Sequence, residues 1–334
     1  MAFPGASRAP TDHGTRHRGR RLWKARTGTD GLNGMHSSQF TFEPVGSGVY
    51  AAIAKPGAGS TSNSGIVDMG SATLVFDTSL TPQGAKDLRT AARLLTGRDP
   101  SIVVNSHWHL DHTLGNQVFG GCSIFSTERT LEELERRGPE MVRAISDPTW
   151  GIATIDLQAR ASAETRPGYR EELQTLVAAR RDLAAGRDLA IVRLPDETFV
   201  DRFRFPGERG VVLIPGAGHS PSDTVLWVHD AEVLFAGDLV SVRTHPSLES
   251  AELPLWIDAL GHLEESRPRV VVPGHGPVGD AGDCSELRAY LEAVRDRTLP
   301  GLLRADGSVY GDWAAPSNRD LTLARLRPKG APQP

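Results

Sequence analysis

The chain has few cysteines, no long apolar run and no large excess of charge of one sign. Its 334 residues include only Cys122 and Cys284, which excludes a disulfide framework or a cysteine-rich zinc module. We predict two buried free thiols, with a single bridge between them as the alternative. No apolar stretch approaches the roughly 18 residues that a membrane span needs. With a formal net charge of -4 and no clustered basic face, nucleic acid and membrane are not expected partners.

The two ends of the chain differ in composition from its middle. Residues 1–38 are basic and rich in Gly, Arg and Thr, so we predict a disordered segment. This segment lacks the apolar core of a secretory signal, and we therefore expect a cytoplasmic location. Residues 39–299 form one expected domain, because their hydrophobic residues follow regular patterns. Residues 300–334 contain many Arg and Pro and are expected to be a weakly ordered tail.

Strand and helix patterns alternate through the expected domain. Strands are predicted at 49–54, 65–68, 73–76, 102–105, 211–215, 224–228, 232–236 and 269–272. Helices are predicted at 82–97, 127–137, 169–185, 253–264 and 284–297, and an irregular, loop-rich segment at 147–167. Residues 127–190 thus read as a helical insertion. Two strand-rich halves, each followed by helices, predict sheets packed together with helices outside.

A dense group of metal-binding residue types follows the strand predicted at 102–105. His107, His109, Asp111 and His112 lie within six residues. Residues two apart in an extended chain point to the same side, so His107 and His109 can bind one metal together. Asp111 and His112 come where the chain turns and can face a second metal nearby. Histidine and carboxylate ligands without thiolates suit zinc, iron or manganese.

Three more candidate ligands occur at later strand ends. His219 follows Pro-Gly-Ala-Gly, Asp238 follows Gly237, and His275 lies in Pro-Gly-His-Gly. Each occupies a glycine-flanked turn after an apolar run, where functional groups can converge at one edge of a sheet. Their order behind the first group favours one shared metal centre.

These motifs together resemble the metallo-β-lactamase superfamily. The match consists of Asp77 in Val-Phe-Asp-Thr, the His-x-His-x-Asp-His motif of residues 107–112, His219, Asp238 and His275. The resemblance implies an α/β (α+β) fold, a four-layer αβ/βα sandwich with its site at one edge, here with the helical insertion after the first metal motif. The segments at 218–223, 233–238 and 271–276 are most similar to the cyclase-like and glyoxalase-II-like branch.

The resemblance also implies a role for each matching residue. The first metal would be bound by His107, His109 and His219. The second would be bound by Asp111, His112 and His275, with Asp238 bridging both. Asp77 is expected to orient ligands rather than bind metal. Two zinc ions per chain would share a hydroxide that attacks an ester, thioester, lactone or amide bond of a small molecule, with Asp111 and Asp238 as catalytic residues.

Alternatives within the same fold remain open at this point. A persulfide dioxygenase with one iron shares the histidine-rich motif, and β-lactamase activity is a further alternative. Diiron reductases of this fold resemble His-x-Glu-x-Asp-His, and the histidine at position 109 argues against them. Arg243 and His245 follow Asp238 closely and are candidate contacts for a substrate carboxylate or phosphate. The sequence predicts no particular oligomeric state.

Overall fold

A computed structural model of the chain describes residues 36–147, 149–186, 191–207, 209–296 and 313–326. The first half contains β1 (Phe40–Gly46), β2 (Val49–Ala54), β3 (Ser64–Asp68), β4 (Thr73–Phe76), α1 (Pro82–Thr96), β5 (Ile102–Val104), α2 (Leu110–Thr113), η2 (Leu114–Val118) and β6 (Ser123–Thr127). Next come α3 (Glu128–Ser146), α4 (Thr149–Ala163), α5 (Pro167–Ala185) and β7 (Glu197–Phe199). The second half contains β8 (Phe203–Arg204), β9 (Val211–Gly216), β10 (Asp223–Val228), η4 (His229–Ala231), β11 (Val233–Ser241), α6 (Leu253–Glu265), β12 (Val270–His275), α7 (Ala281–Arg295) and α9 (Pro316–Leu326).

Within these residues the strands form two sheets. The first has the order β1-β2-β3-β4-β5-β6-β7, antiparallel up to β4 and parallel beyond it. The second has the order β12-β11-β10-β9-β8, in which β11 and β12 are parallel and the other neighbours antiparallel. Strands β4 and β5 run in one direction, as do β9, β11 and β12. Their carboxyl ends therefore lie at common sheet edges, where the predicted site residues follow.

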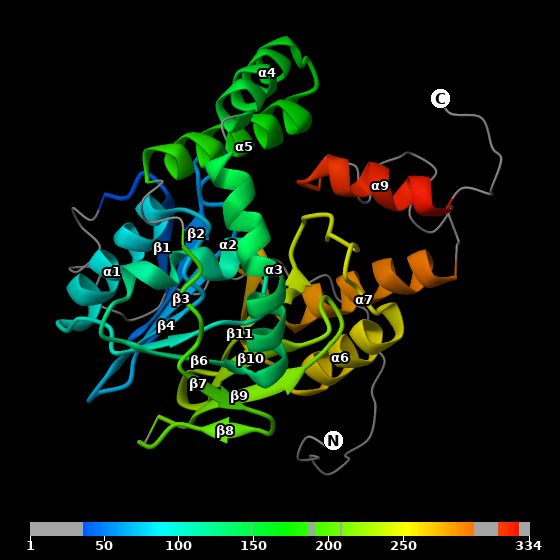
Figure 1. The fold of residues 1–334 in the computed structure, drawn as a ribbon. Helices are drawn as coiled ribbons and strands as arrows, with labels where there is room; N and C mark the ends of the chain where they lie inside the picture. The colour runs from blue at the N-terminus through cyan, green and yellow to red at the C-terminus, as the bar shows by residue number, and fades with distance from the viewer. Residues whose placement is uncertain (1–35, 148, 187–190, 208, 297–312, 327–334) are drawn as a thin grey trace.

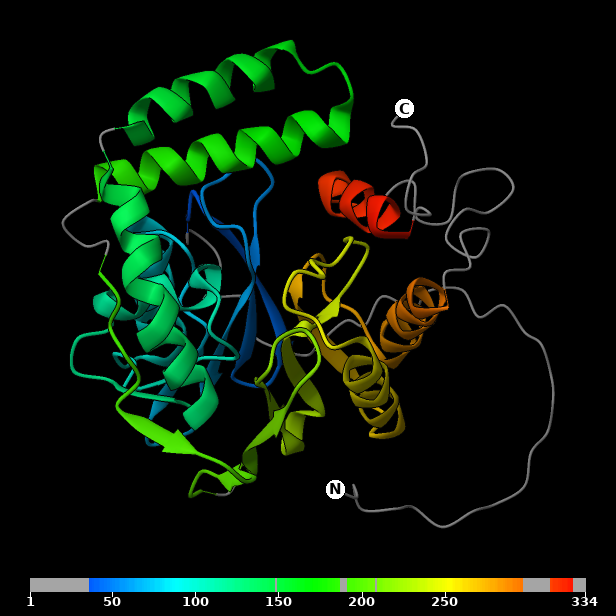
Figure 2. The same cartoon turned by 45° about the vertical axis from the view of Figure 1, so that its right-hand side comes forward.

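Hydrophobic side chains divide the molecule into layers. A core that includes Phe76 and Phe235 fills the space between the two sheets. The outer face of the first sheet packs against Leu88 and the rest of the apolar side of α1. The outer face of the second sheet packs against Trp256 of α6 and Leu287 of α7. Figures 1 and 2 show these helices on opposite sides of the sheets, which confirms the predicted four-layer fold.

Helix α1 shows how local sequence sets element boundaries. The Thr81 side chain accepts a hydrogen bond from the Gly84 backbone N–H at 3.1 Å, and Pro82 occupies the first turn, where no N–H partner is needed. Gly97 ends the helix with a φ of 73°, and its N–H donates to the Arg93 carbonyl. The helix predicted at 82–97 is thus confirmed.

The prediction of an irregular segment at 147–167 is wrong, because helix α4 occupies most of these residues. Helix α4 lies against α5, and the Arg180 guanidinium sits 3.6 Å above the Trp150 ring. The sequence of α4 lacks the amphipathic pattern that usually reveals a helix. Its apolar residues do not mark one buried face, since Ile152 and Ile155 are 71% and 73% exposed. Helices α3, α4 and α5 together occupy the segment of the predicted insertion, and Figure 2 shows α4 and α5 lying along one another above the sheets.

Strand β11 continues further than its predicted end at Ala236. It runs to Ser241, but its pairing with β12 shifts on both sides of Gly237. This irregularity gives Asp238 its place within a strand rather than after one. The cause is the local backbone, since Gly237 has a φ of 52° that few other residues adopt.

The ends of the chain differ from the expectation where the structure describes them. Of the segment 1–38, only residues 36–38 are described; the rest of that prediction lies outside the described residues. Within the tail expected at 300–334, residues 316–326 form α9 and Trp313 is buried. The Trp313 ring stacks on Tyr290 of α7 with centroids 5.6 Å apart, a contact that its sequence position does not reveal. None of the described helices has the length and apolar character needed to cross a bilayer.

Candidate metal centre

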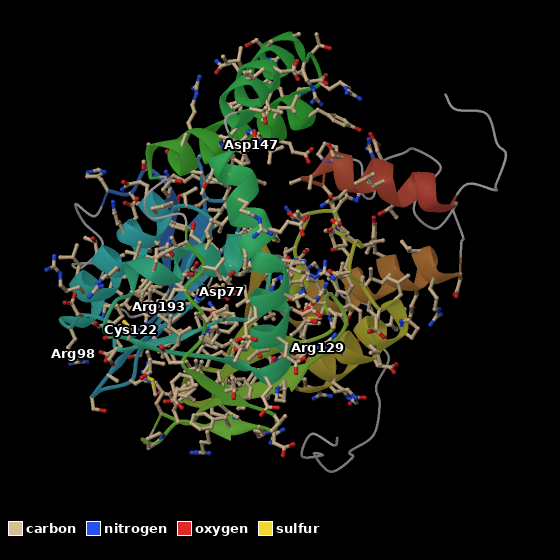
Figure 3. The ribbon with its side chains drawn as sticks, viewed as in Figure 1. Asp77, Arg98, Cys122, Arg129, Asp147 and Arg193 are labelled. Atoms are coloured by element: carbon tan, nitrogen blue, oxygen red, sulfur yellow. The ribbon has the colours of Figure 1, made fainter. Side chains whose placement is uncertain are left out.

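The predicted ligands lie at or near the ends of strands from both sheets, and these ends meet in one place. Strand β5 leads into the turn that carries His107, and β9 leads to His219. Asp238 lies within β11, and His275 is the last residue of β12. Asp77 directly follows β4. Figure 3 shows Asp77 inside the molecule, whereas Arg98 lies at its periphery.

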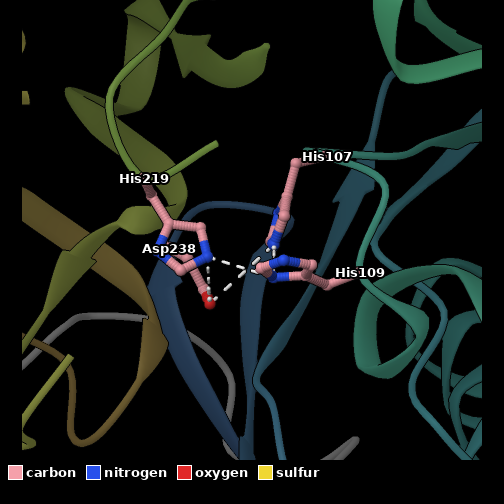
Figure 4. A group of neighbouring side chains, drawn as sticks. All are labelled: His107, His109, His219 and Asp238. Atoms are coloured by element: carbon pink, nitrogen blue, oxygen red, sulfur yellow. Dashed lines mark hydrogen bonds and ion pairs between the residues drawn. The ribbon is translucent and has the colours of Figure 1, made fainter. Parts of the chain in front are cut away.

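The first group of side chains consists of His107, His109, His219 and Asp238. One ligand atom from each lies within 4.8 Å of the others. Nδ1 of His109 is 2.9 Å from Nε2 of His107 and 3.1 Å from Nε2 of His219. Oδ2 of Asp238 is 3.3 Å from Nε2 of His219. Figure 4 shows the four side chains directed toward a common point, so the structure brings the predicted first set together.

The second group consists of Asp111, His112 and His275. Oδ2 of Asp111 is 3.5 Å from Nε2 of His275 and 3.6 Å from Nε2 of His112. Asp238 reaches this group too, because its Oδ1 is 3.1 Å from Nε2 of His112 and its Oδ2 is 3.2 Å from Nε2 of His275. The carboxylate of Asp238 thus touches both groups, the position expected of a bridging ligand.

Hydrogen bonds to the sides of the His112 and His275 rings that point away from the metal centre determine which ring nitrogen faces it. Nδ1 of His112 is 2.7 Å from Oδ2 of Asp77, and Nδ1 of His275 is 2.9 Å from the Thr61 carbonyl. Each acceptor holds the ring proton on Nδ1, which leaves the Nε2 lone pair free to bind metal. Asp77 also accepts the Ser106 backbone N–H at 2.7 Å. The Asp77 carboxylate thus contacts both the His112 ring and the backbone of Ser106, directly before His107.

His109 has the opposite orientation. Its Nδ1 faces the centre, and its Nε2 is 3.2 Å from Oγ of Ser250. The Ser250 hydroxyl is also 3.4 Å from the His219 carbonyl. Sequence reasoning missed Ser250, because it lies in the loop between β11 and α6, far from both histidines in the chain.

A buried amide pair supports the turn that carries His112. Asn105 and Asn116 exchange side-chain hydrogen bonds of 2.9 and 3.0 Å. The Thr78 hydroxyl lies 2.9 Å from Oδ1 of Asn116 and 3.1 Å from the His112 carbonyl. All three side chains are fully buried. Sequence reasoning missed them, since only their position beside the motif could have drawn attention to them.

Burial and the mutual proximity of these groups shift their pKa values. Burial lowers the pKa of His107 well below its usual value, and burial lowers the pKa of His219 to about 3. Burial also lowers the pKa of His112, but the Asp238 and Asp111 carboxylates outweigh it and raise that pKa well above its usual value. The pKa of His275 is raised by the same two carboxylates against the effect of burial. Without a cation, the centre thus combines rings that favour the neutral form with rings that favour the protonated form, around the Asp238 carboxylate, whose pKa is well below its usual value.

The donor set fits two divalent cations. Ligand atoms about 2.0–2.1 Å from a tetrahedral zinc ion lie about 3.4 Å apart, close to the separations in both groups. Nε2 of His112 and Oδ1 of Asp238 are buried and 3.1 Å apart, and neither makes a well-directed hydrogen bond, which suits two atoms that share a metal ion. Three imidazole nitrogens that converge on one point also need a cation between their lone pairs. The residues therefore fit the implied metals.

Trp108 and the two predicted substrate contacts lie outside the ligand set. Trp108, between two ligands in sequence, is buried, and the Arg137 guanidinium of α3 covers its ring at 4.5 Å. Arg243 is exposed at the start of the loop after β11, with a φ of 51°. His245 is buried, with Nδ1 3.3 Å from the Tyr290 hydroxyl. The structure therefore places His245 within a packed cluster, where it offers no surface to a substrate.

Comparisons with known proteins agree with the fold described above. Similar solved structures include a metallo-β-lactamase from Pontibacter korlensis, with 20% identity and a TM-score of 0.53, covering 76% of this chain and 99% of that one. Another comes from Hirschia baltica, with 16% identity and a TM-score of 0.51, covering 76% of this chain and 97% of that one. The DIM-1 metallo-β-lactamase exposed to ceftazidime has 16% identity and a TM-score of 0.55, covering 77% and 99%. At these identities the likeness concerns the fold alone.

A comparison with protein-family models shows which family the chain belongs to. The family described as the metallo-beta-lactamase superfamily matches residues 57–275, well over half of the chain. The matched range contains every one of the seven candidate ligands and Asp77. The chain therefore belongs to the metallo-β-lactamase superfamily and is a metallo-hydrolase of that family.

Proposed function

We propose that this chain is a dinuclear zinc hydrolase that cleaves an ester, thioester, lactone or amide bond of a small molecule. The observation that carries the proposal is the position of Asp238. Its two oxygens lie 3.1–3.3 Å from nitrogens of His112, His219 and His275, and so span both ligand groups. A carboxylate placed in this way supports two metals side by side rather than one. His107 and His109 complete the first site, and Asp111 completes the second.

Two zinc ions held here would lower the pKa of a shared water and polarise the bond to be cleaved. The protein's own contribution is to orient the ligands and to handle the proton. Asp111 suits the second task, because its side chain is 24% exposed and its Oδ2 faces the centre. It is thus within reach of an attacking water, whereas Asp238 is buried and held by histidines. We therefore assign proton transfer to Asp111 and metal bridging to Asp238.

Differences in exposure suggest the side from which substrate enters. The side chains of Asp111 and His275 are about a quarter exposed, while those of His107 and His219 are buried. A substrate would thus approach over the second metal site. A small molecule in the cytoplasm is the proposed substrate, in keeping with the net charge of -4 and the scattered basic residues. Arg243 keeps an exposed guanidinium for an anionic substrate group, and we propose it as a contact in place of His245.

Elemental analysis of the purified chain tests the proposal. We expect about two zinc ions per chain, followed by turnover of at least one member of a panel of lactones, thioesters, esters and β-lactams. Asp238→Ala should lose both metal and turnover, and His262→Ala, a surface histidine paired with Glu265, should lose neither. About one iron per chain, with oxygen uptake in the presence of persulfides, would overturn the zinc hydrolase and favour a dioxygenase.

A further inference from the structure

Residues 61–63 form a connection between the first sheet and the second ligand group. They lie in the loop between β2 and β3, which carries no ligand itself. The Thr61 carbonyl accepts from Nδ1 of His275, and the Ser62 hydroxyl donates to the Asp111 carbonyl. One short segment thus contacts two of the three residues of the second group.

Asn63 is the central residue of this connection. Its side-chain NH₂ donates to the Pro273 carbonyl at 3.0 Å and to the Gly276 carbonyl at 2.8 Å. Its backbone N–H donates to the Gly274 carbonyl at 2.7 Å. The turn that carries His275 is therefore held on both sides of the histidine by a single residue from the other half of the molecule.

The side-chain oxygen of Asn63 also makes a hydrogen bond. Oδ1 accepts the Ala54 backbone N–H of β2 at 3.0 Å, and the side chain is only 4% exposed. The Ala54 N–H needs an acceptor, and the Pro273 and Gly276 carbonyls need donors. The Asn63 amide must therefore turn its oxygen toward Ala54 and its NH₂ toward the two carbonyls. The amide is thus a rigid link from β2 to the end of β12.

We propose that Asn63 is a positioning residue for the second metal site, and that it controls the affinity of that site more strongly than the affinity of the first. The inference rests on the proposed dinuclear function. The hydrogen bonds of Asn63 go to Ala54 and to the turn of residues 273–276, and among the described residues none goes to a member of the first group. Its hydrogen bonds instead fix the backbone on which His275 is mounted, and Thr61 and Ser62 extend the same support to the His275 ring and to Asp111.

The matching substitution is Asn63→Asp, which keeps the shape but replaces the NH₂ donors with a carboxylate oxygen. That oxygen would face the Pro273 and Gly276 carbonyls and repel both, so the turn must move. Loss of such supporting contacts typically weakens a metal site by about 10- to 100-fold. We expect this loss mainly in the zinc-binding step that depends on His275, with a smaller effect on the other step because Gly274 of this turn packs against Asp238.

The experiment is a zinc titration of the full chain against a chromogenic chelator. Wild type should bind in two steps. His275→Ala and His219→Ala identify which step belongs to which site, since each removes one ligand of one group. Asn63→Asp should weaken the His275-dependent step about 10- to 100-fold and the His219-dependent step clearly less. Added to His275→Ala, Asn63→Asp should change zinc binding less than it does in wild type.

The outcomes separate this inference from the proposed function. Two steps in wild type with both unchanged, or both weakened equally, in Asn63→Asp would overturn the inference and leave the dinuclear site standing. A single step in wild type would overturn the dinuclear function and the inference with it. Thr96→Val removes a buried hydroxyl bonded to Thr73 at the far end of β4, and serves as a control for general destabilisation. If Asn63→Asp does not fold, Ser62→Ala replaces it, with a smaller loss expected in the same step.

Discussion

Asp77 joins the two sides of the metal motif through one carboxylate. Its Oδ2 lies 2.7 Å from Nδ1 of His112, and its Oδ1 accepts the Ser106 backbone N–H at the same distance. The residue is buried and has a φ of 61°, an uncommon backbone conformation for a residue other than glycine. Such strain is tolerated because the surrounding contacts hold the backbone in place.

Asp77→Asn should therefore weaken zinc binding despite its identical shape. The amide NH₂ would face Nδ1 of His112 and favour the tautomer with the proton on Nε2, which blocks the ligand atom. We expect a loss of about 10- to 100-fold in the affinity of the second site, measured by chelator competition. Asp68→Asn is the control, because Asp68 pairs with Arg98 at the surface. Equal affinities in Asp77→Asn and wild type would contradict the orienting role.

His109→Ala and Asp238→Ala should each abolish turnover and lower metal content. His109 supplies the nitrogen that lies between those of His107 and His219, and Asp238 contacts both groups. Asp238→Ala should thus lose more metal than His109→Ala, which we expect to retain the second site. Elemental analysis and activity on any substrate found for wild type provide the measurement. Full activity in either purified variant would rule out the two-metal centre.

Zinc binding should release protons from the metal-free chain at about pH 7. The pKa of His112 is raised well above the usual 6.5 and that of His275 is raised above it, which favours protonated rings, and a proton on Nε2 must leave before metal binds. His107 and His219 contribute no protons, because their lowered pKa values keep them neutral, and Asp238 is already ionised. Zinc affinity should consequently fall as the pH is lowered.

An indicator dye in weak buffer measures this release directly. We expect a measurable release of protons as zinc saturates the chain. The His275→Ala variant provides the comparison, since it removes one of the two rings with a raised pKa and should release fewer protons. Zinc uptake with no change in proton concentration would show that both rings are neutral beforehand.

Gly274→Ala should disrupt the bridging carboxylate. A Cβ atom at this position would lie 1.9 Å from Oδ1 of Asp238, with backbone atoms of Gly237 and Asp238 also closer than 3.0 Å. Because backbone cannot move aside as a flexible side chain does, Asp238 must shift, and zinc content should fall. Gly261→Ala is the matched control, since its added Cβ meets nothing within 4 Å and the exchange favours helix α6 by up to about 1 kcal/mol. Two zinc ions retained in Gly274→Ala would contradict this account.

Much of the site could be predicted because its signals are local. His107, His109, Asp111 and His112 are close in sequence, and each later ligand follows an apolar run with glycine beside it. Strand periodicity and the capping of α1 likewise depend on near neighbours, so eight strands and most of the helices predicted are present, whereas β1, β6, β7 and β8 were missed and α3 extends beyond its predicted end at 137. Helix α4 was missed because contacts with α5, rather than an amphipathic pattern of its own, determine its packing.

The residues that support the ligands could not be predicted, because their contacts join segments that are far apart in sequence. Asn63 meets Pro273 and Gly276 across more than 200 residues of chain, and Ser250 meets His109 across 141. Nothing in the sequence around Asn63 or Ser250 marks them as partners of a metal centre. The exclusion of His245 from the site is equally non-local, since it follows from packing against Tyr290 and Trp313.

The sequence by itself determined the ligand types, their order, the strand that precedes each, and the family that these motifs identify. These properties depend on residue chemistry and on two- and four-residue periodicities, which are visible along the chain. Only the tertiary structure decided which oxygens of Asp238 reach which histidines, which nitrogen of each ring faces inward, and which loops hold the second group in place. Those features arise where the two sheets meet, because the geometry there depends on hydrogen bonds and packing between segments that are distant in sequence.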